Sequence, residues 1–259
     1  MSRPPVLYKY LNRKGADVFL ERPQLQHREF YQLDDICDSL PAFSTLSEEH
    51  SLQNAIERVS RNPVTGIPVE KQVTFYKELG MLPPEYLEQQ MRELISKGEG
   101  YTAYVCSLVA RPDSIAMWSQ YAEHHRGIAF GIPTHLHRVI SDKGRFIEQV
   151  EYPPTNERLH TPFNNPKLDE KIAHVFWTKG LEWDYQQEWR IISGNAETDF
   201  LESGEVAEIV FGWRFDGDKE RVMRSEIFEA TRFFEATPCP THYRMSLREI
   251  QKSNSCSGR

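Results

Sequence analysis

The stretch from Leu181 to Gly194 (LEWDYQQEWRIISG) combines apolar residues with side chains that can do chemistry. In an extended conformation, alternate residues point to opposite faces, so Gln186, Glu188 and Arg190 share one face. A purely structural strand needs only its apolar face. The carboxylate and the guanidinium, two residues apart, therefore make this stretch the first candidate for a functional site.

Two interpretations of this polar face remain open from the residues alone. Glu188 could orient a sugar hydroxyl or stabilise a cationic centre, while Arg190 or Lys179 could hold a phosphate or a carboxylate. The same side chains could instead pair with residues of neighbouring strands and serve only the fold. In the functional interpretation, the face lines a ligand cleft and Glu188 is its catalytic group.

Other candidate residues lie in two short motifs. In the motif LYKY, alternation places the side chains of Lys9 and Tyr10 on opposite faces of the strand. Lys9 is either a ligand-binding cation or a solvated residue that protects an edge strand from pairing with another chain. In WSQYAEHH, the helical spacing of Trp118, Tyr121 and His125 predicts one stripe. Such a stripe is typical of a core, but the polar tips of Tyr121 and His125 also suit a cleft wall.

The acidic run DDICD, Asp34 to Asp38, offers carboxylates for a nuclease-like metal site. A metal would need further ligands in the right geometry, so the residues favour a solvated acidic turn. The sequence lacks the GxxxxGK[ST], GxGxxG, HExxH and GxSxG signatures. We expect no bound metal.

Composition limits the possible partners. The 259 residues carry a formal net charge of -7, which disfavours a protein that coats duplex nucleic acid. The four cysteines are scattered and form no CxxC pair, a pattern typical of a reducing compartment. Neither a signal peptide nor a run of about 20 apolar residues is present, so we expect a cytoplasmic protein without a membrane partner.

The order of elements predicts an α+β fold with a mixed or mostly antiparallel sheet. We expect one domain over residues 1–236, a helical insertion at about 44–100 and a polar C-terminal tail at 237–259 whose last residues are frayed. The inserted block should pack through a stripe of four apolar residues, Leu87, Met91, Leu94 and Ile95. Gly127 should end the helix that carries Trp118, with a positive φ angle.

Five segments carry a resemblance to a known family: LYKY, MWSQYAEHHRGIAFGI, VEY, FWTKGLEWDYQQEWRII and EIVFG. In order and spacing they resemble the bacterial family known as domain of unknown function 2971, from about residue 6 to 215. That family name implies no activity.

More distantly, the chain is similar to ADP-ribosyltransferases, which bind NAD in a cleft between two small sheets. The similarity places Lys9 in the nucleotide-holding slot of the first strand, which is usually Arg or His. It places Ser107 beside the nicotinamide ribose and Glu188 on a ribose hydroxyl. Tyr10, the Trp118 stripe and Arg190 would complete the nucleotide site.

The resemblance thus implies an effector of toxin or phage-defence type that binds a nucleotide, NAD, as its substrate. It would transfer ADP-ribose to a protein or nucleic acid acceptor, or to water as an NAD glycohydrolase. The alternatives are a non-enzymatic ligand-sensing or partner-binding module and a nuclease-like defence effector.

Overall fold

The computed structural model describes residues 3–33, 35, 38, 42–44, 53, 56–57, 60–61, 68–79, 81, 104–136, 145–154, 160–162, 176–193 and 198–252. The chain divides into two units. The first comprises Met1–Arg28, Tyr104–Val150 and Trp183–Arg259, and the second comprises Glu29–Ala103 and Glu151–Glu182.

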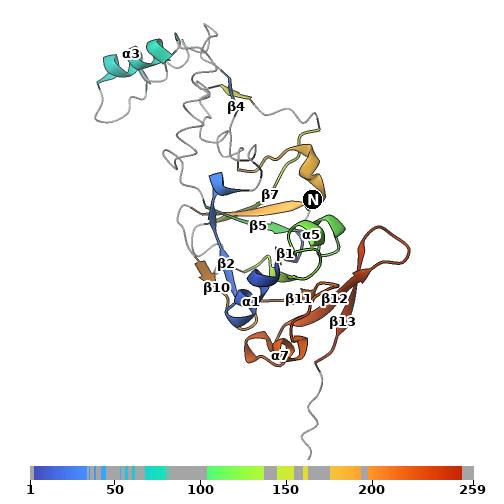
Figure 1. Cartoon of the computed structure of the whole chain (residues 1–259). Helices are drawn as coiled ribbons and strands as arrows, with labels where there is room; N and C mark the ends of the chain where they lie inside the picture. Colours follow the sequence, from blue (N-terminus) through green and yellow to red (C-terminus); the bar gives the residue numbers. More distant parts are fainter. Residues whose placement is uncertain are drawn as a thin grey trace, which may run out of the picture. The chain divides into compact units, whose positions relative to one another are not determined.

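A mostly antiparallel sheet forms the first unit (Figure 1). Its strands follow the order β13–β12–β11–β6–β1–β5–β9–β7, with the two-residue β3 (Arg28–Glu29) beside β5. Only the pairing of β11 with β12 is parallel among the strand pairs in this order. The strands are β1 Val6–Leu11, β5 Tyr104–Val109, β6 Ile128–Pro133, β7 Phe146–Gln149, β9 Glu188–Ser193, β11 Glu208–Phe211, β12 Arg232–Pro238 and β13 Met245–Ile250.

Short helices and a second small sheet complete this unit. The predicted α+β class and the mostly antiparallel sheet are confirmed. The additional elements are α1 Arg13–Glu21, β2 Gln24–Gln26, α5 Ile115–Gln120, the 3-10 turn η3 Leu181–Gln186, β10 Thr198–Phe200 paired with β2, α7 Lys219–Met223 and η4 Glu226–Phe228.

The second unit contains α3, Val69–Leu79, which lies within the predicted helical block. The stripe Leu87, Met91, Leu94 and Ile95 lies outside the described residues, so its packing stays a prediction. The other elements among the described residues of this unit are η1 Phe30–Gln32 and the parallel strands β4 Ala42–Ser44 and β8 His160–Pro162. None of the helices described in either unit combines the length and apolar composition needed to cross a bilayer.

Each face of the large sheet buries its own core. On the α1 face, Leu7 and Ile191 pack with Phe19 of α1, and Phe19 stacks on Phe130 with ring centroids 3.8 Å apart. On the α5 face, the core includes Tyr8, Tyr10, Val109, Met117, Trp118, Ala129 and Val210. Alternation along β1 explains the assignment, because residues 7 and 8 point to opposite faces.

The sheet has a seam between β1 and β5. β1 pairs with β6 along its full length, from Val6↔Pro133 to Leu11↔Ile128. β5 pairs equally fully with β9, from Tyr104↔Ser193 to Val109↔Glu188. Between β1 and β5, however, the register contains the pair Tyr8↔Val109 alone. Two well-paired halves therefore meet at one residue pair.

Two expectations need correction. The region from residue 237 is not simply a polar tail, because β12 continues to Pro238 and β13 pairs with it from Met245 to Ile250. This edge strand has mainly polar or half-exposed residues, so its composition resembled a tail.

The expected role of Gly127 is wrong. The helix ends at Gln120, and φ at Gly127 is not positive. A Cβ atom at Gly127 would lie 1.8 Å from the backbone oxygen of Leu11, so close approach of two backbone segments requires glycine there.

Candidate functional site

Strand register brings most of the candidate residues to the α5 face. A transverse row crosses five strands through Glu208, Gly131, Tyr8, Val109 and Glu188.

On the same face, Tyr10 pairs with Ala129, and Arg190 pairs with both Ser107 and Glu148. Strand pairing and alternation therefore place four candidates on one face: Tyr10, Ser107, Glu188 and Arg190. We call these four, together with Trp118 and Tyr121, the α5-face site.

Glu188 and Arg190 form a buried ion pair on one strand. Arg190 Nε donates to Glu188 Oε1 at 2.9 Å, and Arg190 Nη2 donates to Oε2 at 3.3 Å. Glu188 is 2% exposed and Arg190 is 0% exposed. Removing one partner of such a pair would take an opposite charge away from a buried ion. The two side chains thus share the predicted face, and they bind each other there.

Trp118 lies at the centre of an aromatic stack. It is fully buried, as predicted, and its Nε1 donates to Pro112 O at 2.8 Å. Tyr10 packs edge-on against it at 5.0 Å between centroids, and His125 stacks parallel to it at 6.2 Å. Burial raises the pKa of Tyr10. Tyr10 and Trp118 therefore support the site from within the core.

The C-terminal end of α5 and the η3 turn form a polar rim. Gln186 Nε2 donates to the hydroxyl of Tyr121 at 2.9 Å, and the hydroxyl of Tyr185 donates to Gln120 Oε1 at 2.8 Å. Gln186 lies in a 3-10 turn rather than on the strand, and Gln187 has a φ angle of 45°. Gln186 therefore leaves the strand pattern but still approaches Tyr121.

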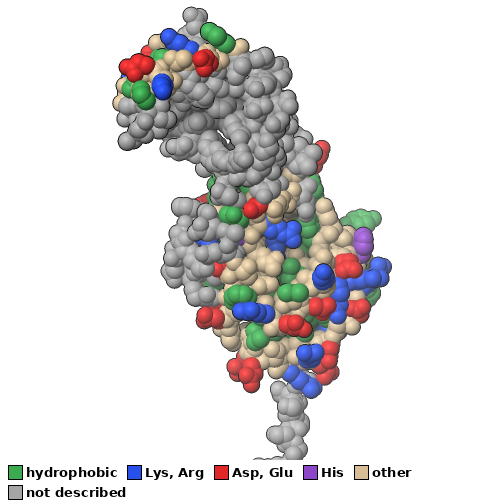
Figure 2. All heavy atoms as spheres, turned by 60° about the vertical axis from the view of Figure 1, so that its left-hand side comes forward, with side chains coloured by type: hydrophobic (Ala, Val, Ile, Leu, Met, Phe, Trp, Pro, Cys, Tyr) green, Lys and Arg blue, Asp and Glu red, His purple; other side chains and the backbone are tan. Residues whose placement is uncertain are grey.

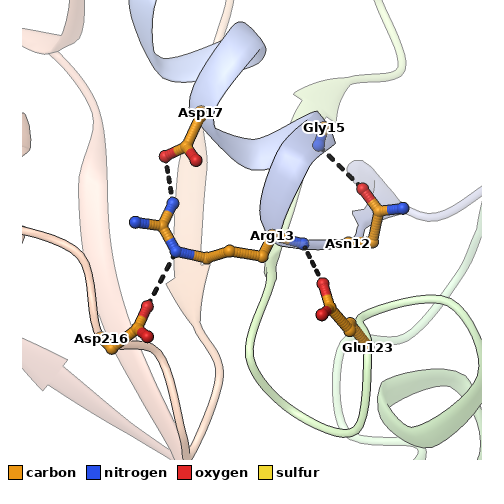
Figure 3. Close-up of polar contacts among 6 residues, drawn as sticks. All are labelled: Asn12, Arg13, Gly15, Asp17, Glu123 and Asp216. Atoms are coloured by element: carbon orange, nitrogen blue, oxygen red, sulfur yellow. Dashed lines mark hydrogen bonds and ion pairs between the residues drawn. The ribbon is translucent and has the colours of Figure 1, made fainter.

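A left-handed turn follows α5. Glu123, His124 and His125 have φ angles of 48°, 52° and 72°. Non-glycine residues adopt this conformation at a cost of about 1–2 kcal/mol each, so other contacts must hold the turn. Figure 3 shows one of them, in which Glu123 Oε2 accepts a hydrogen bond from the backbone N–H of Arg13 at the start of α1.

This turn presents His125 to the site. Its Nδ1 is buried and has no hydrogen-bond partner among the described residues. Burial, followed by the charges of Arg214 and His124, lowers the pKa of His125. A neutral imidazole that carries its proton on Nε2 suits this environment, because protonation of Nδ1 would bury an unsatisfied N–H group.

Lys9 does not join the other candidates. Lys9 alternates with Tyr8 and Tyr10, so its stem lies on the α1 face of the sheet. On that face its positive charge lowers the pKa of Cys106, against the rise that burial causes. Its ammonium nevertheless reaches the seam, donating to the backbone oxygen of Ser107 at 2.8 Å. Lys9 and Glu188 thus flank β5 from opposite faces of the sheet.

A buried charge cluster on the α1 face was missed by the sequence analysis. Asp199 Oδ2 accepts from Arg145 Nη1 and lies 3.0 Å from His27 Nε2, and all three side chains are buried. No short motif links these residues, because they come from three distant segments. A second missed contact joins Tyr8 to Glu208, at 2.5 Å from the hydroxyl to Oε2.

In the second unit, the predicted acidic turn contains a buried ion pair. Asp38 is buried, and its Oδ2 lies 3.5 Å from Lys179 Nζ. Asp34, Ile36 and Cys37 lie outside the described residues. Within the described part of the chain, no three histidine, cysteine, aspartate or glutamate side chains are grouped as a metal site would need.

On the face that Figure 2 shows, acidic and basic side chains of the described residues are interspersed, without a continuous basic band. That distribution does not resemble the basic surface on which phosphate-backbone binding depends.

Comparison with known proteins gives one match. Residues 117–191 match the model of the family described as protein of unknown function (DUF2971). The matched segment contains Trp118, Tyr121, His125, Glu188 and Arg190, and it supports the family resemblance over this part of the chain. No curated protein and no solved structure matches the chain.

Proposed function

We propose that the chain is an NAD-using effector of the ADP-ribosyltransferase type, with its nucleotide site at the seam between β1 and β5. The seam is the observation that carries the proposal. One residue pair joins two sheet halves there, and the similarity implies a site between two small sheets. The proposed slots Lys9 and Ser107 meet across the seam, and Glu188 pairs with Val109, the β5 residue of the joining pair.

The exposure of the side chains divides the candidates into two groups. Ser107, Tyr121 and His125 are half-buried and would contact the nucleotide. The Tyr121 hydroxyl would bind a polar edge of the nucleotide. Lys9, whose stem lies on the opposite face of the sheet, would hold the seam through the backbone oxygen of Ser107. Tyr10, Trp118 and Arg190 are buried and would hold the site in shape.

Glu188 would act on the nicotinamide ribose. Its carboxylate would accept a hydrogen bond from a ribose hydroxyl and stabilise the oxocarbenium-like charge that develops as nicotinamide leaves. Because both carboxylate oxygens accept from Arg190, the ribose hydroxyl must share or replace one of these bonds. Arg190 would thereby position the carboxylate, and a protein, a nucleic acid or water would accept the ADP-ribose.

The test is incubation of the full chain with NAD, followed by measurement of free nicotinamide and of the mass of candidate acceptors. Glu188→Gln should abolish nicotinamide release. The same substitution at the exposed Glu249 of β13 is the matched control, and this variant should still release nicotinamide. Wild-type protein that neither binds nor consumes NAD would remove the proposal.

A second candidate function is a non-enzymatic ligand-sensing or partner-binding module. It is favoured by the near-complete burial of Glu188 and Arg190 and by their two hydrogen bonds, which suit a structural pair. In this case the wild-type chain would bind its ligand without turnover of NAD, so Glu188→Gln would change stability alone.

A further inference from the structure

The turn between β12 and β13 carries a cysteine, a hydroxyl and an imidazole at one place. It comprises Cys239, Thr241 and His242, and in Figure 1 the β12–β13 hairpin projects from the sheet. Cys239 Sγ lies 3.5 Å from Thr241 Oγ1 and 4.0 Å from His242 Nδ1. Thr241 Oγ1 lies 2.8 Å from the same Nδ1, which closes a triangle of contacts.

The backbone holds this triangle in place. Cys239 N–H donates to Arg244 O at 3.0 Å, and Arg244 N–H donates to His242 O at 2.8 Å. The thiol is half-exposed, whereas Cys106 is fully buried. Accessible thiols with nearby hydrogen-bond donors are the reactive ones in proteins, and buried thiols are inert.

We propose that Cys239 is a modification site that exchanges with low-molecular-weight disulfides, with Thr241 and His242 stabilising its thiolate. The site lies outside the nucleotide site proposed above and does not depend on it. The Cys239 thiol first loses its proton to solvent. Sγ then attacks one sulfur of the small disulfide, a new S–S bond forms, the old S–S bond breaks, and the other half leaves as a thiolate that water protonates.

Electrostatics around the thiol agree with this geometry. Hydrogen bonds from the hydroxyls of Thr241 and Ser246, the Thr241 backbone and His242 together lower the pKa of Cys239 to about 5. An ordinary cysteine has a pKa of about 8.5. A less basic thiolate is also a weaker nucleophile. The rate of Cys239 should therefore exceed that of an ordinary thiol most clearly in mildly acidic solution, where ordinary thiols are protonated. At about pH 5.5 we expect Cys239 to react roughly ten-fold faster than an unperturbed thiol.

The test is exposure of the reduced full chain to glutathione disulfide across a range of pH, with peptide mass spectrometry to locate the adduct. Cys239 should gain one glutathionyl group, at a rate that rises through about pH 5 and then levels off. Cys106 should stay unmodified in the folded chain. Thr241→Val should move the rise to higher pH, while Tyr243→Phe, fully exposed in the same turn, should not.

Two outcomes would overturn the proposal. One is an unmodified Cys239 in a folded chain whose denatured form reacts. The other is a rate that rises only near about pH 8.5, as for an ordinary thiol, and is unchanged by Thr241→Val. Because nicotinamide release measures the nucleotide site separately, failure of one proposal leaves the other standing.

Discussion

The ammonium of Lys9 lies 2.8 Å from the backbone oxygen of Ser107, where β1 and β5 share only one register pair. A side chain thus supplies a hydrogen bond between two strands whose backbone ladder is incomplete. Lys9 is therefore part of the connection between the two halves of the sheet, whether or not it also binds a ligand.

Replacing this lysine should weaken the fold. Lys9→Met keeps most of the apolar stem and removes the charged donor, so it should lower the free energy of unfolding by about 1.5 kcal/mol. Lys14→Met, at an exposed position on α1, is the matched control and should change stability by less than about 0.5 kcal/mol. Urea unfolding measures both, and equal effects for the two variants would contradict the seam role.

Two glycines should respond differently to alanine. At Gly127 the new Cβ would collide with the backbone of Leu11, and backbone atoms have little room to move. Gly127→Ala should therefore lower the free energy of unfolding by at least about 2 kcal/mol. Gly204 has a φ angle of 88° and open space around it, so Gly204→Ala should cost only about 1 kcal/mol. A reversed order in thermal unfolding would show that the approach to Leu11 is not tight.

His125 should make stability depend on pH. Its folded-state pKa is lowered, so the unfolded chain binds more protons as the pH falls below about 6.5. The contribution of neutral His125 to stability is therefore complete above about pH 6.5 and is lost as the pH falls towards the folded-state pKa. His125→Gln should reduce this loss between about pH 7.5 and 5.5, whereas the exposed control His135→Gln should not. Identical pH profiles for wild type and His125→Gln would contradict the prediction.

The sequence predicted those features that depend on local alternation. β1, β5, β6 and β9 follow from β-branched and aromatic runs bounded by turns, and the burial of Trp118 follows from its helical stripe. The shared face of Glu188 and Arg190 follows from the two-residue period of a strand.

Features that depend on long-range contact could not be predicted. The buried cluster of His27, Arg145 and Asp199 joins segments up to 172 residues apart. The opposed directions of Lys9 and Glu188 depend on the register that connects their strands through β5, which no single stretch contains. The position of the positive φ angles, on Glu123 to His125 rather than on Gly127, is set by the contacts that the turn makes with the start of α1 and with Arg214, which follows β11.

The last prediction concerns the energetic coupling of Glu188 and Arg190. Each single variant, Glu188→Gln and Arg190→Met, removes one charge of the buried ion pair, so each should cost about 3 kcal/mol. The double variant removes both charges together. It should therefore lose less than the sum of the single effects, with a coupling energy of about 1–3 kcal/mol.

An exposed ion pair gives the control for this cycle. Glu220 and Arg224, four residues apart with an N–O distance of 3.0 Å, have side chains 67% and 61% exposed. The equivalent substitutions there should couple by less than about 0.5 kcal/mol, because solvent screens the pair. Coupling at Glu188 and Arg190 no larger than in this control would show that the buried pair contributes little to stability. If Glu188→Gln also kept its stability and lost nicotinamide release, the carboxylate would be assigned to catalysis, since the lost interaction would then belong to the transition state.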